Sequence, residues 1–548
     1  MSDLVDDMVR QMSSEQLIGQ LLMIGFPGTS VTSDVLDLIA SGGVGNIILF
    51  SRNFESRHQI VRLTAALQSA ARASRHPLPL LIATDQENGI IRRTGSASTC
   101  FPGNMALGAI NSEADTEAAA RATGEELRAL GITMNLAPVV DISNNPANPV
   151  IGVRSFGADP ELVARLGAAA TRGYQASGVA ATLKHFPGHG DTTVDSHLAL
   201  PTITADIQRL DTVELAPFRR AISAGADAVM TAHVALPAIT GSNTLPATLA
   251  PEVLQGLLRE RLGFAGVVIT DCLEMRAISA GVGSARGAVR SLQAGADIAL
   301  VSHRFDRQAG VLNAIRAAAE QEVLSMDTIR AAAARVLRLK QQLLTWDDSA
   351  AGYALSKQTM AEHQRLANDL YARSMTIIRD DAGLLPLNVK TPAAYRALVV
   401  SQTEVQVSNA ADRGFSLDIF ADALKEQLDS ESRGHPVAVT AIALPASSRA
   451  ADLATIPQLA AQADVVILLT SNAHLPRNRA AGRATVQAVL AARRPVVGVA
   501  VCDPYDAAAL PEILTWLATY DYTAPALNAA ARVLTGTLAA SGTLPVTL

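Results

Sequence analysis

Eight short apolar runs alternate with helical stretches over the first 345 residues, and this alternation constrains the fold more than any other feature. Most runs are continuous rather than alternating, as expected for parallel strands that are buried on both faces. The intervening stretches have helical spacing, for example Thr116–Leu130 and Glu161–Ser177. The runs are Leu21–Phe26, Asn46–Phe50, Leu80–Ala83, Met134–Val140, Val179–Leu183, Ala228–Ala232, Val267–Thr270 and Ile298–Val301. Eight such units in a row predict a (β/α)8 barrel, with a doubly wound sheet as the structural alternative.

The pattern restarts after a helix predicted over Met326–Leu344. We therefore expect a barrel domain at residues 1–345, a linker at 346–359 and a smaller α/β sandwich at 360–548. A helix over Met360–Ser374 is expected to open the sandwich, whose loops contain no dense group of titratable residues in the sequence. Its predicted strands are Met375–Ile378, Ala397–Val400, Val437–Ile442, Val465–Leu469 and Val496–Val501.

Charge and composition exclude several classes of function. The net charge of −6 and the lack of a basic stripe argue against a nucleic-acid partner. The three cysteines, Cys100, Cys272 and Cys502, form no disulfide pattern and indicate free thiols. The N-terminus lacks the features of a secretory signal, and no apolar run is long enough to span a membrane. We expect a cytoplasmic protein without a membrane partner; the sequence leaves the oligomeric state open.

Polar residues stand where the apolar runs end. In a barrel, reactive side chains lie at the carboxyl ends of the strands and in the loops that follow. Burying a charge at such a position is unfavourable unless the charge is paired or used in function. A structural ion pair explains one such residue well, but polar residues at the ends of six strands in register around one rim indicate a functional site. The residues are Asp85, Asp141, Lys184, His185, His233, Asp271 and His303.

The loop Phe186–His197 contains the densest group of titratable residues. Pro187 and the glycines that follow it interrupt any regular structure. Within the loop, Asp195 stands two positions before His197, so both side chains can turn to one side. A carboxylate that accepts from one ring nitrogen orients an imidazole and raises its basicity, which leaves the other nitrogen for proton transfer.

The loop also offers two other interpretations. A metal site is one, because the loop and its flank offer five ligands, but their spacing does not match the usual zinc motifs. A phosphate-binding loop is the other, but Gly188-His-Gly190 lacks the full glycine pattern. We favour the proton-transfer pair and expect neither a metal nor a cofactor. The potential metal ligands are His185, His189, Asp191, Asp195 and His197.

Asp271 emerges from the seventh apolar run. Acetal hydrolysis in two steps needs one group to attack the anomeric carbon and another to protonate the leaving oxygen. Asp271 suits the first role, and His197 suits the second. The neighbouring Cys272 is interpreted as a packing residue, whereas Glu274 is either an ion-pair partner or solvated.

These residues resemble glycoside hydrolase family 3, in its two-domain β-N-acetylglucosaminidase branch. The block Lys184-His-Phe-Pro-Gly-His-Gly-Asp191 followed by Asp195-Ser-His197 resembles the signature of that branch. The likeness covers most of the chain, and it is weak by itself in the C-terminal part. Further similar segments are Asp85-Gln-Glu-Asn-Gly89 with Arg93, Asn135–Asp141, Asn148–Phe156, Ile269-Thr-Asp271, Leu384–Leu387 and Leu544–Val546.

The resemblance implies a role for each matching residue. Asp271 would form the glycosyl-enzyme, and His197 would be the acid/base, assisted by Asp195. The terminal sugar would be held by five residues, namely Asp85, Arg93, Arg154, Lys184 and His185. Two residues depart from the family pattern: Asn88 replaces a glycine and Ile90 replaces an arginine. Asparagine tolerates left-handed backbone angles, so we expect the turn at Asn88 to persist.

The expected activity is hydrolysis of terminal β-linked N-acetylglucosamine (GlcNAc), with retention of anomeric configuration, from muropeptides or chitooligosaccharides. The partner is thus a small carbohydrate. A β-N-acetylglucosaminide phosphorylase with the same residues is the alternative, because a histidine that has given up its proton does not repel phosphate. A third, non-enzymatic possibility is a sugar sensor on the same fold, which would bind GlcNAc without turnover.

Overall fold

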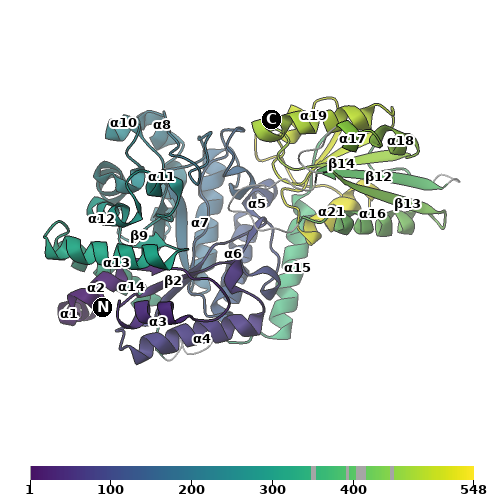
Figure 1. The fold of residues 1–548 in the computed structure, drawn as a ribbon. Helices are drawn as coiled ribbons and strands as arrows, with labels where there is room; N and C mark the ends of the chain where they lie inside the picture. The colour runs from purple at the N-terminus through teal and green to yellow at the C-terminus, as the bar shows by residue number, and fades with distance from the viewer. Residues whose placement is uncertain (1, 347–352, 390–393, 403–414, 445–449) are drawn as a thin grey trace.

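The computed structural model describes residues 2–346, 353–389, 394–402, 415–444 and 450–548. Its strands form an eight-stranded sheet, a six-stranded sheet and one short hairpin. Figure 1 shows the two large sheets in separate bodies, the first coloured purple to teal and the second green to yellow. Among the described residues, no helix combines the length and apolar character that crossing a bilayer requires.

All eight predicted barrel strands are present. Each pairs in parallel with its neighbour in chain order, and a bridge between Ile269 and Ile298 brings the last two strands together. The order contains no reversal, so the (β/α)8 prediction is confirmed and the doubly wound alternative is wrong. The strands are β1 (Leu22–Ile24), β2 (Asn46–Leu49), β3 (Leu81–Thr84), β6 (Met134–Asn135), β7 (Ala180–Phe186), β8 (Ala228–Thr231), β9 (Val267–Thr270) and β10 (Ala299–Val301).

Two strand ends differ from the prediction. β6 stops before Val140 because Pro138 has no N–H to continue the ladder, and only Val139 pairs again, with Lys184. β7 continues to Phe186 rather than ending at Leu183, since the Phe186 carbonyl accepts the Ala232 N–H at 2.7 Å. The side chains of Lys184 and His185 are therefore anchored within a strand, not on a loop.

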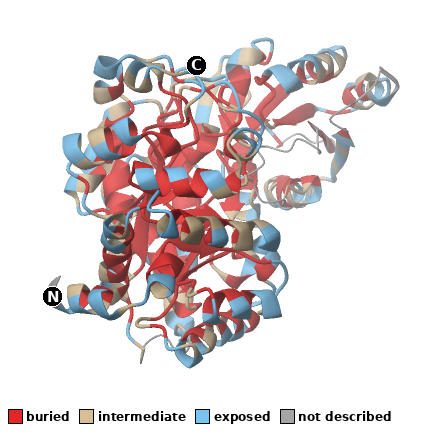
Figure 2. Cartoon of the chain, turned by 60° about the vertical axis from the view of Figure 1, so that its left-hand side comes forward, coloured by how far each residue is buried: buried red, intermediate tan, exposed pale blue. Residues whose placement is uncertain are grey.

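Helices surround the barrel, with their inward faces buried and their outward faces exposed (Figure 2). Local sequence defines their starts: Asp159 caps α7 by accepting from main-chain N–H groups, and Pro160 occupies the first helical position. The helices are α1 (Ser2–Gln11), α2 (Ser14–Gln20), α3 (Ser33–Ala40), α4 (Arg57–Ala73), α5 (Asn104–Ile110), α6 (Glu113–Ala129), α7 (Pro160–Ala176), α8 (Ile207–Thr212), α9 (Ala216–Ser223), α10 (Pro237–Thr240), the π-helix η5 (Glu252–Arg261), α11 (Arg276–Ser279), α12 (Ser284–Ala294), α13 (Phe305–Glu320) and α14 (Met326–Leu343).

Short elements complete the barrel domain. They are the hairpin strands β4 (Gln86–Asn88) and β5 (Ile91–Arg92) and the turns η1 (Ser51–Asn53), η2 (Gly95–Ala97), η3 (Gly152–Arg154) and η4 (Ala247–Leu249). The hairpin and η3 follow β3 and β6, so both lie at the carboxyl ends of the barrel strands.

The second sheet is mixed, with the order β11-β16-β15-β14-β12-β13, and only β11 runs antiparallel to its neighbour. The sequence did not predict β16, a run of only four residues. The elements are α15 (Lys357–Ser374), β11 (Thr376–Asp380), β12 (Tyr395–Gln402), α16 (Leu417–Glu431), β13 (Val437–Leu444), α17 (Ala450–Leu453), α18 (Ile456–Ala461), β14 (Val465–Thr470), α19 (Pro476–Leu490), β15 (Val496–Ala500), α20 (Asp506–Ala509), β16 (Thr515–Ala518) and α21 (Ala524–Thr535).

The two bodies share one apolar cluster. Ile91 of β5, Met105 of α5 and Val153 of η3 pack in the same cluster as Val399 and Leu517 of the second sheet. α15 also contacts both bodies, as Figure 1 shows. The predicted linker, 346–359, includes residues 347–352, which lie outside the described residues. The predicted domain boundary at residue 345 stays a prediction.

Candidate active site

A cavity of about 390 Å³ opens at the carboxyl ends of the barrel strands. All residues to which the resemblance gives a catalytic or sugar-binding role line it except Asp195, which is bonded to His197. Two of the predicted rim residues, Asp141 and His233, do not line the cavity. Every residue that lines it belongs to the barrel domain, from Ile48 to His303. The barrel thus brings together residues that are up to about half the chain apart, as parallel strands with a common carboxyl end require.

Two cations and two carboxylates form one side of the cavity. The Lys184 ammonium is 2.7 Å from Asp85 and 2.6 Å from Glu87. Arg154 donates to both oxygens of Glu87, each at 2.9 Å. Burial alone would raise the pKa of Glu87, but Arg154 and Lys184 outweigh it and hold that pKa well below its usual range. The sequence analysis did not anticipate Glu87, which orders both cations.

His185 is oriented by Asp141. Its Nδ1 is 2.7 Å from an Asp141 oxygen, and Asp141 also accepts from the His189 N–H at 2.7 Å. The other ring nitrogen, Nε2, is 3.3 Å from an Arg154 nitrogen that can only donate. This pattern assigns the proton of a neutral His185 to Nδ1. Burial would raise the pKa of Asp141, but His185 outweighs it and lowers that pKa.

The predicted pair of Asp195 and His197 forms. His197 Nδ1 is 2.8 Å from Asp195 Oδ1, which also accepts the main-chain N–H of His197 at 2.8 Å. The imidazole is 37% exposed, whereas the carboxylate is only 9% exposed. Burial lowers the pKa of His197, but the bond to Asp195 and the charge of Asp271 outweigh it and raise that pKa. Nδ1 is committed to Asp195, so Nε2 is the nitrogen available for proton transfer.

The histidine loop is braced through its own side chains and through a neighbouring loop. His189 Nδ1 is 2.9 Å from the Thr192 hydroxyl, and its Nε2 is 3.2 Å from that of Ser196. Asn148 donates to the carbonyls of His189 and Gly190, at 2.8 and 2.7 Å. His185, His189 and His197 therefore bond to separate partners, and in the described part of the chain their ligand atoms do not converge.

Asp271 follows β9 directly. Its Oδ1 accepts the Cys272 N–H at 2.7 Å. Burial would raise the pKa of Asp271, but His233, His185 and His197 outweigh it and lower that pKa. His233 itself is fully buried behind the strand, with bonds to Thr248 at 2.8 Å and to the Cys272 carbonyl at 3.0 Å. Asp271 is thus an ionised carboxylate that faces the same cavity as His197.

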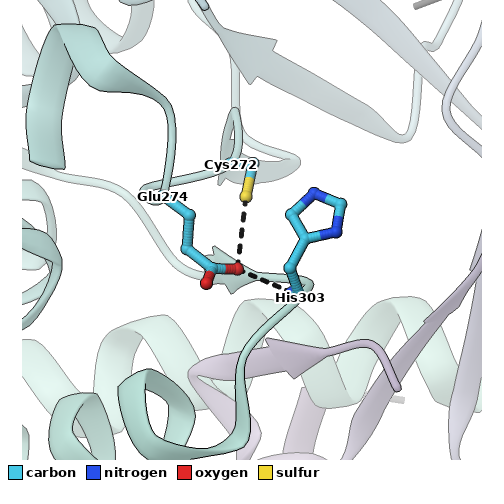
Figure 3. A group of neighbouring side chains, drawn as sticks. All are labelled: Cys272, Glu274 and His303. Atoms are coloured by element: carbon cyan, nitrogen blue, oxygen red, sulfur yellow. Dashed lines mark hydrogen bonds between the residues drawn. The ribbon is translucent and has the colours of Figure 1, made fainter. Parts of the chain in front are cut away.

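Cys272, Glu274 and His303 form another side of the cavity (Figure 3). In the described part of the chain, they are the one group of at least three His, Cys, Asp or Glu side chains whose potential metal-ligand atoms all lie within 4.8 Å of one another. The group does not fit a metal ion. The Glu274 carboxylate accepts main-chain N–H groups, including that of His303 at 2.6 Å, and burial raises the pKa of the Cys272 thiol to about 12. Arg52 lies 3.3 Å from His303 Nδ1 and occupies its lone pair.

Both departures from the family pattern have a structural basis. Asn88 has a φ of 69°, so the turn persists in the left-handed region, as expected. Ile90 is 6% exposed and packs in the apolar cluster that joins the two bodies, where an arginine would bury an extra charge. Arg93 lines the cavity beside Phe50, with its guanidinium 6.0 Å from the ring centre.

Comparisons with known proteins agree with this architecture. Residues 13–339 match the family described as glycosyl hydrolase family 3 N terminal domain. The chain is 34% identical to β-hexosaminidase A of Pseudoalteromonas piscicida over 467 residues, which are 76% of this chain and 77% of that one. A family 3 β-N-acetylglucosaminidase from Paenibacillus sp. str. FPU-7 superposes with a TM-score of 0.88 at 43% identity, covering 98% and 99% of the two chains.

A fungal multi-domain family 3 β-N-acetylglucosaminidase is also similar, with a TM-score of 0.88 at 39% identity. The match covers 98% of this chain but only 61% of the fungal one, which contains a GCN5-related glucosamine N-acetyltransferase region.

Proposed function

Since the chain belongs to glycosyl hydrolase family 3 and is a glycoside hydrolase, we propose that it is a retaining exo-β-N-acetylglucosaminidase. Asp271 is the nucleophile, His197 is the acid/base and Asp195 orients His197. One observation carries this proposal: His197 and Asp271 line the same cavity with pKa values shifted in opposite directions. A raised pKa keeps the imidazole protonated, and a lowered pKa keeps the carboxylate ionised, as the first chemical step requires.

The reaction has two steps. In the first, an Asp271 oxygen attacks the anomeric carbon while His197 Nε2 transfers its proton to the leaving oxygen, so the aglycone departs and a glycosyl ester of Asp271 remains. In the second, neutral His197 removes a proton from water, which attacks the anomeric carbon and releases Asp271. Two inversions at one carbon give net retention. Cys272 N–H binds Oδ1 of Asp271, so Oδ2 is the attacking oxygen.

The terminal sugar occupies the charged side of the cavity. Asp85, Lys184 and His185 lie there with Arg154, and Arg93 lies beside Phe50. Carboxylates accept hydrogen bonds from sugar hydroxyls, whereas the cations donate them, and their mutual ion pairs hold them in place before substrate binds. Because these ion pairs bound the cavity, we assign it to a single terminal residue of the substrate, at the ends of muropeptides and of chitooligosaccharides.

The test uses an aryl β-GlcNAc with proton NMR of the newly formed sugar. We expect release of the phenol and initial appearance of β-GlcNAc. Initial α-GlcNAc, or no release at all, would contradict the proposal. A parallel reaction with phosphate separates hydrolysis from phosphorolysis, because only phosphorolysis yields a sugar 1-phosphate. Competition between chitobiose and a muropeptide that carries terminal GlcNAc identifies the preferred aglycone.

A further inference from the structure

A buried group of titratable side chains lies in the second domain, outside the cavity. His474 follows β14, whereas Asp503, Tyr505 and Asp506 follow β15, and we call these four residues the interdomain cluster. His474 Nδ1 is 2.8 Å from Asp506 Oδ1, which also accepts the main-chain N–H of His474 at 2.9 Å. The expectation that these loops hold no dense titratable group is therefore wrong, because the partners are 32 residues apart in sequence.

The interdomain cluster bonds to one barrel loop, residues 143–154. The Tyr505 hydroxyl donates to the Ser143 carbonyl at 2.9 Å. The His474 imidazole bonds to the Pro146 carbonyl. The Asp503 carboxylate lies against Gly152 and close to the Val153 N–H, which partly offsets the effect of burial on its pKa. Three side chains of the second domain thus contact the main chain of the loop near its start, its middle and its end.

Gly152 allows the closest of these approaches. Its φ is +43°, and a Cβ built there would lie 2.4 Å from Asp503 Oδ2. Glycine permits both the backbone angle and the close approach of the carboxylate. Any side chain at this position would displace the Asp503 carboxylate.

The same loop carries two groups of the active site. Arg154 follows Val153 directly and donates hydrogen bonds to both carboxylate oxygens of Glu87 in the cavity wall. Asn148 holds the histidine loop through the carbonyls of His189 and Gly190. The loop therefore lies between the interdomain cluster and the cavity, and a shift at Val153 would move Arg154.

Burying polar residues in a domain interface costs desolvation free energy, which apolar packing would avoid. Within the described ranges of the chain, Asp503 Oδ1 and Asp506 Oδ2 are buried without a hydrogen-bond partner, and burial raises the pKa of Asp503 to about 6. The directional bonds that these residues make to the loop are what packing alone would not provide.

We propose that the second domain positions Arg154 through the interdomain cluster, which holds the loop 143–154 from the side opposite the cavity. Asp503 is the principal positioning residue, because its carboxylate lies against Gly152 and Val153, the two residues that precede Arg154. This inference rests on the sugar-binding role of Arg154 in the proposed function.

A double-mutant cycle on the full chain tests the proposal, with kcat/KM for an aryl β-GlcNAc as the readout. We expect Asp503→Ala to lower kcat/KM roughly tenfold to a hundredfold, as a misplaced binding group does. Asp503→Asn keeps an acceptor oxygen and should lose only about twofold. In the Arg154→Ala background, Asp503→Ala should cause little further loss. Arg154→Lys replaces Arg154→Ala if the latter does not fold.

Hydrogen exchange of the segment 143–157 is the second readout. Asp503→Ala should increase exchange there, whereas Val466→Ala should not, because Val466 lies in the apolar cluster on the other side of the second sheet. The proposal is overturned if the kcat/KM losses of Asp503→Ala and Arg154→Ala multiply in full in the double variant. It is also overturned if Asp503→Ala leaves hydrogen exchange of the segment 143–157 unchanged. If Arg154→Ala leaves kcat/KM unaltered, the sugar-binding assignment fails instead, and exchange still decides whether Asp503 holds the loop.

Discussion

The barrel and the second domain each contain a histidine bonded to an aspartate with the same geometry. His197 Nδ1 lies 2.8 Å from Asp195, and His474 Nδ1 lies 2.8 Å from Asp506. The two imidazoles differ in exposure, 37% for His197 and 7% for His474. They also differ in what the other ring nitrogen meets: a cavity that contains Asp271 for His197, and a carbonyl for His474. The comparison teaches that the surroundings of the second nitrogen, not the Asp–His bond, set what such a pair can do. A cavity leaves that nitrogen available for proton transfer, whereas a neighbouring carbonyl occupies it.

The largest effect is expected from replacing Asp271, the carboxylate that lies in the cavity with His197 and has no counterpart assigned beside His474. Asp271→Ala should lower kcat for an aryl β-GlcNAc by roughly 10⁴-fold or more, because no other carboxylate is assigned to form the covalent intermediate. Asp271→Asn, which keeps the shape, should lose as much. Steady-state kinetics with a thermal melt as folding control measure both variants. Activity near wild type in either variant would place the nucleophile elsewhere.

Replacing each of the two histidines in turn sharpens the comparison. His197→Ala should lower kcat about 10²- to 10⁴-fold, as loss of a general acid does, and most for substrates with poor leaving groups. His474→Ala should lower it less than about tenfold, because His474 acts only through the loop. Parallel assays with aryl glycosides of graded leaving-group pKa measure this difference. Equal losses, or a dependence on the leaving group in His474→Ala, would show that the two pairs do not differ as described.

The loss of stability should be larger in His474→Ala than in His197→Ala, the reverse of the order expected for activity. His474→Ala leaves the Asp506 carboxylate buried without its partner, so the free energy of unfolding should fall by about 3 kcal/mol, more than in His197→Ala. The folded pKa of His474 is raised, so its contribution is fully present below the ordinary pKa and is lost as pH rises through the folded value. The gap between wild type and His474→Ala should therefore shrink from pH 5 to pH 9 in chemical denaturation. A gap that widens with pH would contradict this assignment.

The smallest expected effect is a shift in a pH profile. kcat/KM should fall at low pH as Asp271 gains a proton and at high pH as His197 loses one. The bond to Asp195 raises the pKa of His197, so Asp195→Asn should move the alkaline limb to lower pH by about one unit. Asp506→Asn is the matched control and should leave that limb in place. An unmoved limb in Asp195→Asn would exclude His197 as the group that titrates there.

Much of the barrel and its site could be predicted because the information is local. Continuous apolar runs indicate buried parallel strands, and the polar residue that ends each run lies at the carboxyl rim by the geometry of the fold. The Asp195–His197 pair was predictable because its members are two residues apart. The early end of β6 follows from Pro138, a local signal that the apolar run obscured.

The groups that were missed join distant segments. Glu87 meets Arg154 from 67 residues away, and its only local signal is its place two residues after Asp85. His474 meets Asp506 from a different strand and meets the barrel across a domain interface. No periodicity or spacing in one segment indicates which residue of another segment will complete a buried hydrogen bond.

The sequence by itself determined the barrel, the rim on which the predicted site residues stand, and the Asp195–His197 pair, because strand period and short spacings are properties of neighbouring residues. Only the tertiary structure decided which carboxylate orders Arg154 and Lys184, where the second domain touches the barrel, and what lies beyond each imidazole. Those contacts depend on how strands and loops far apart in the chain are packed, and packing is settled only when the whole chain has folded.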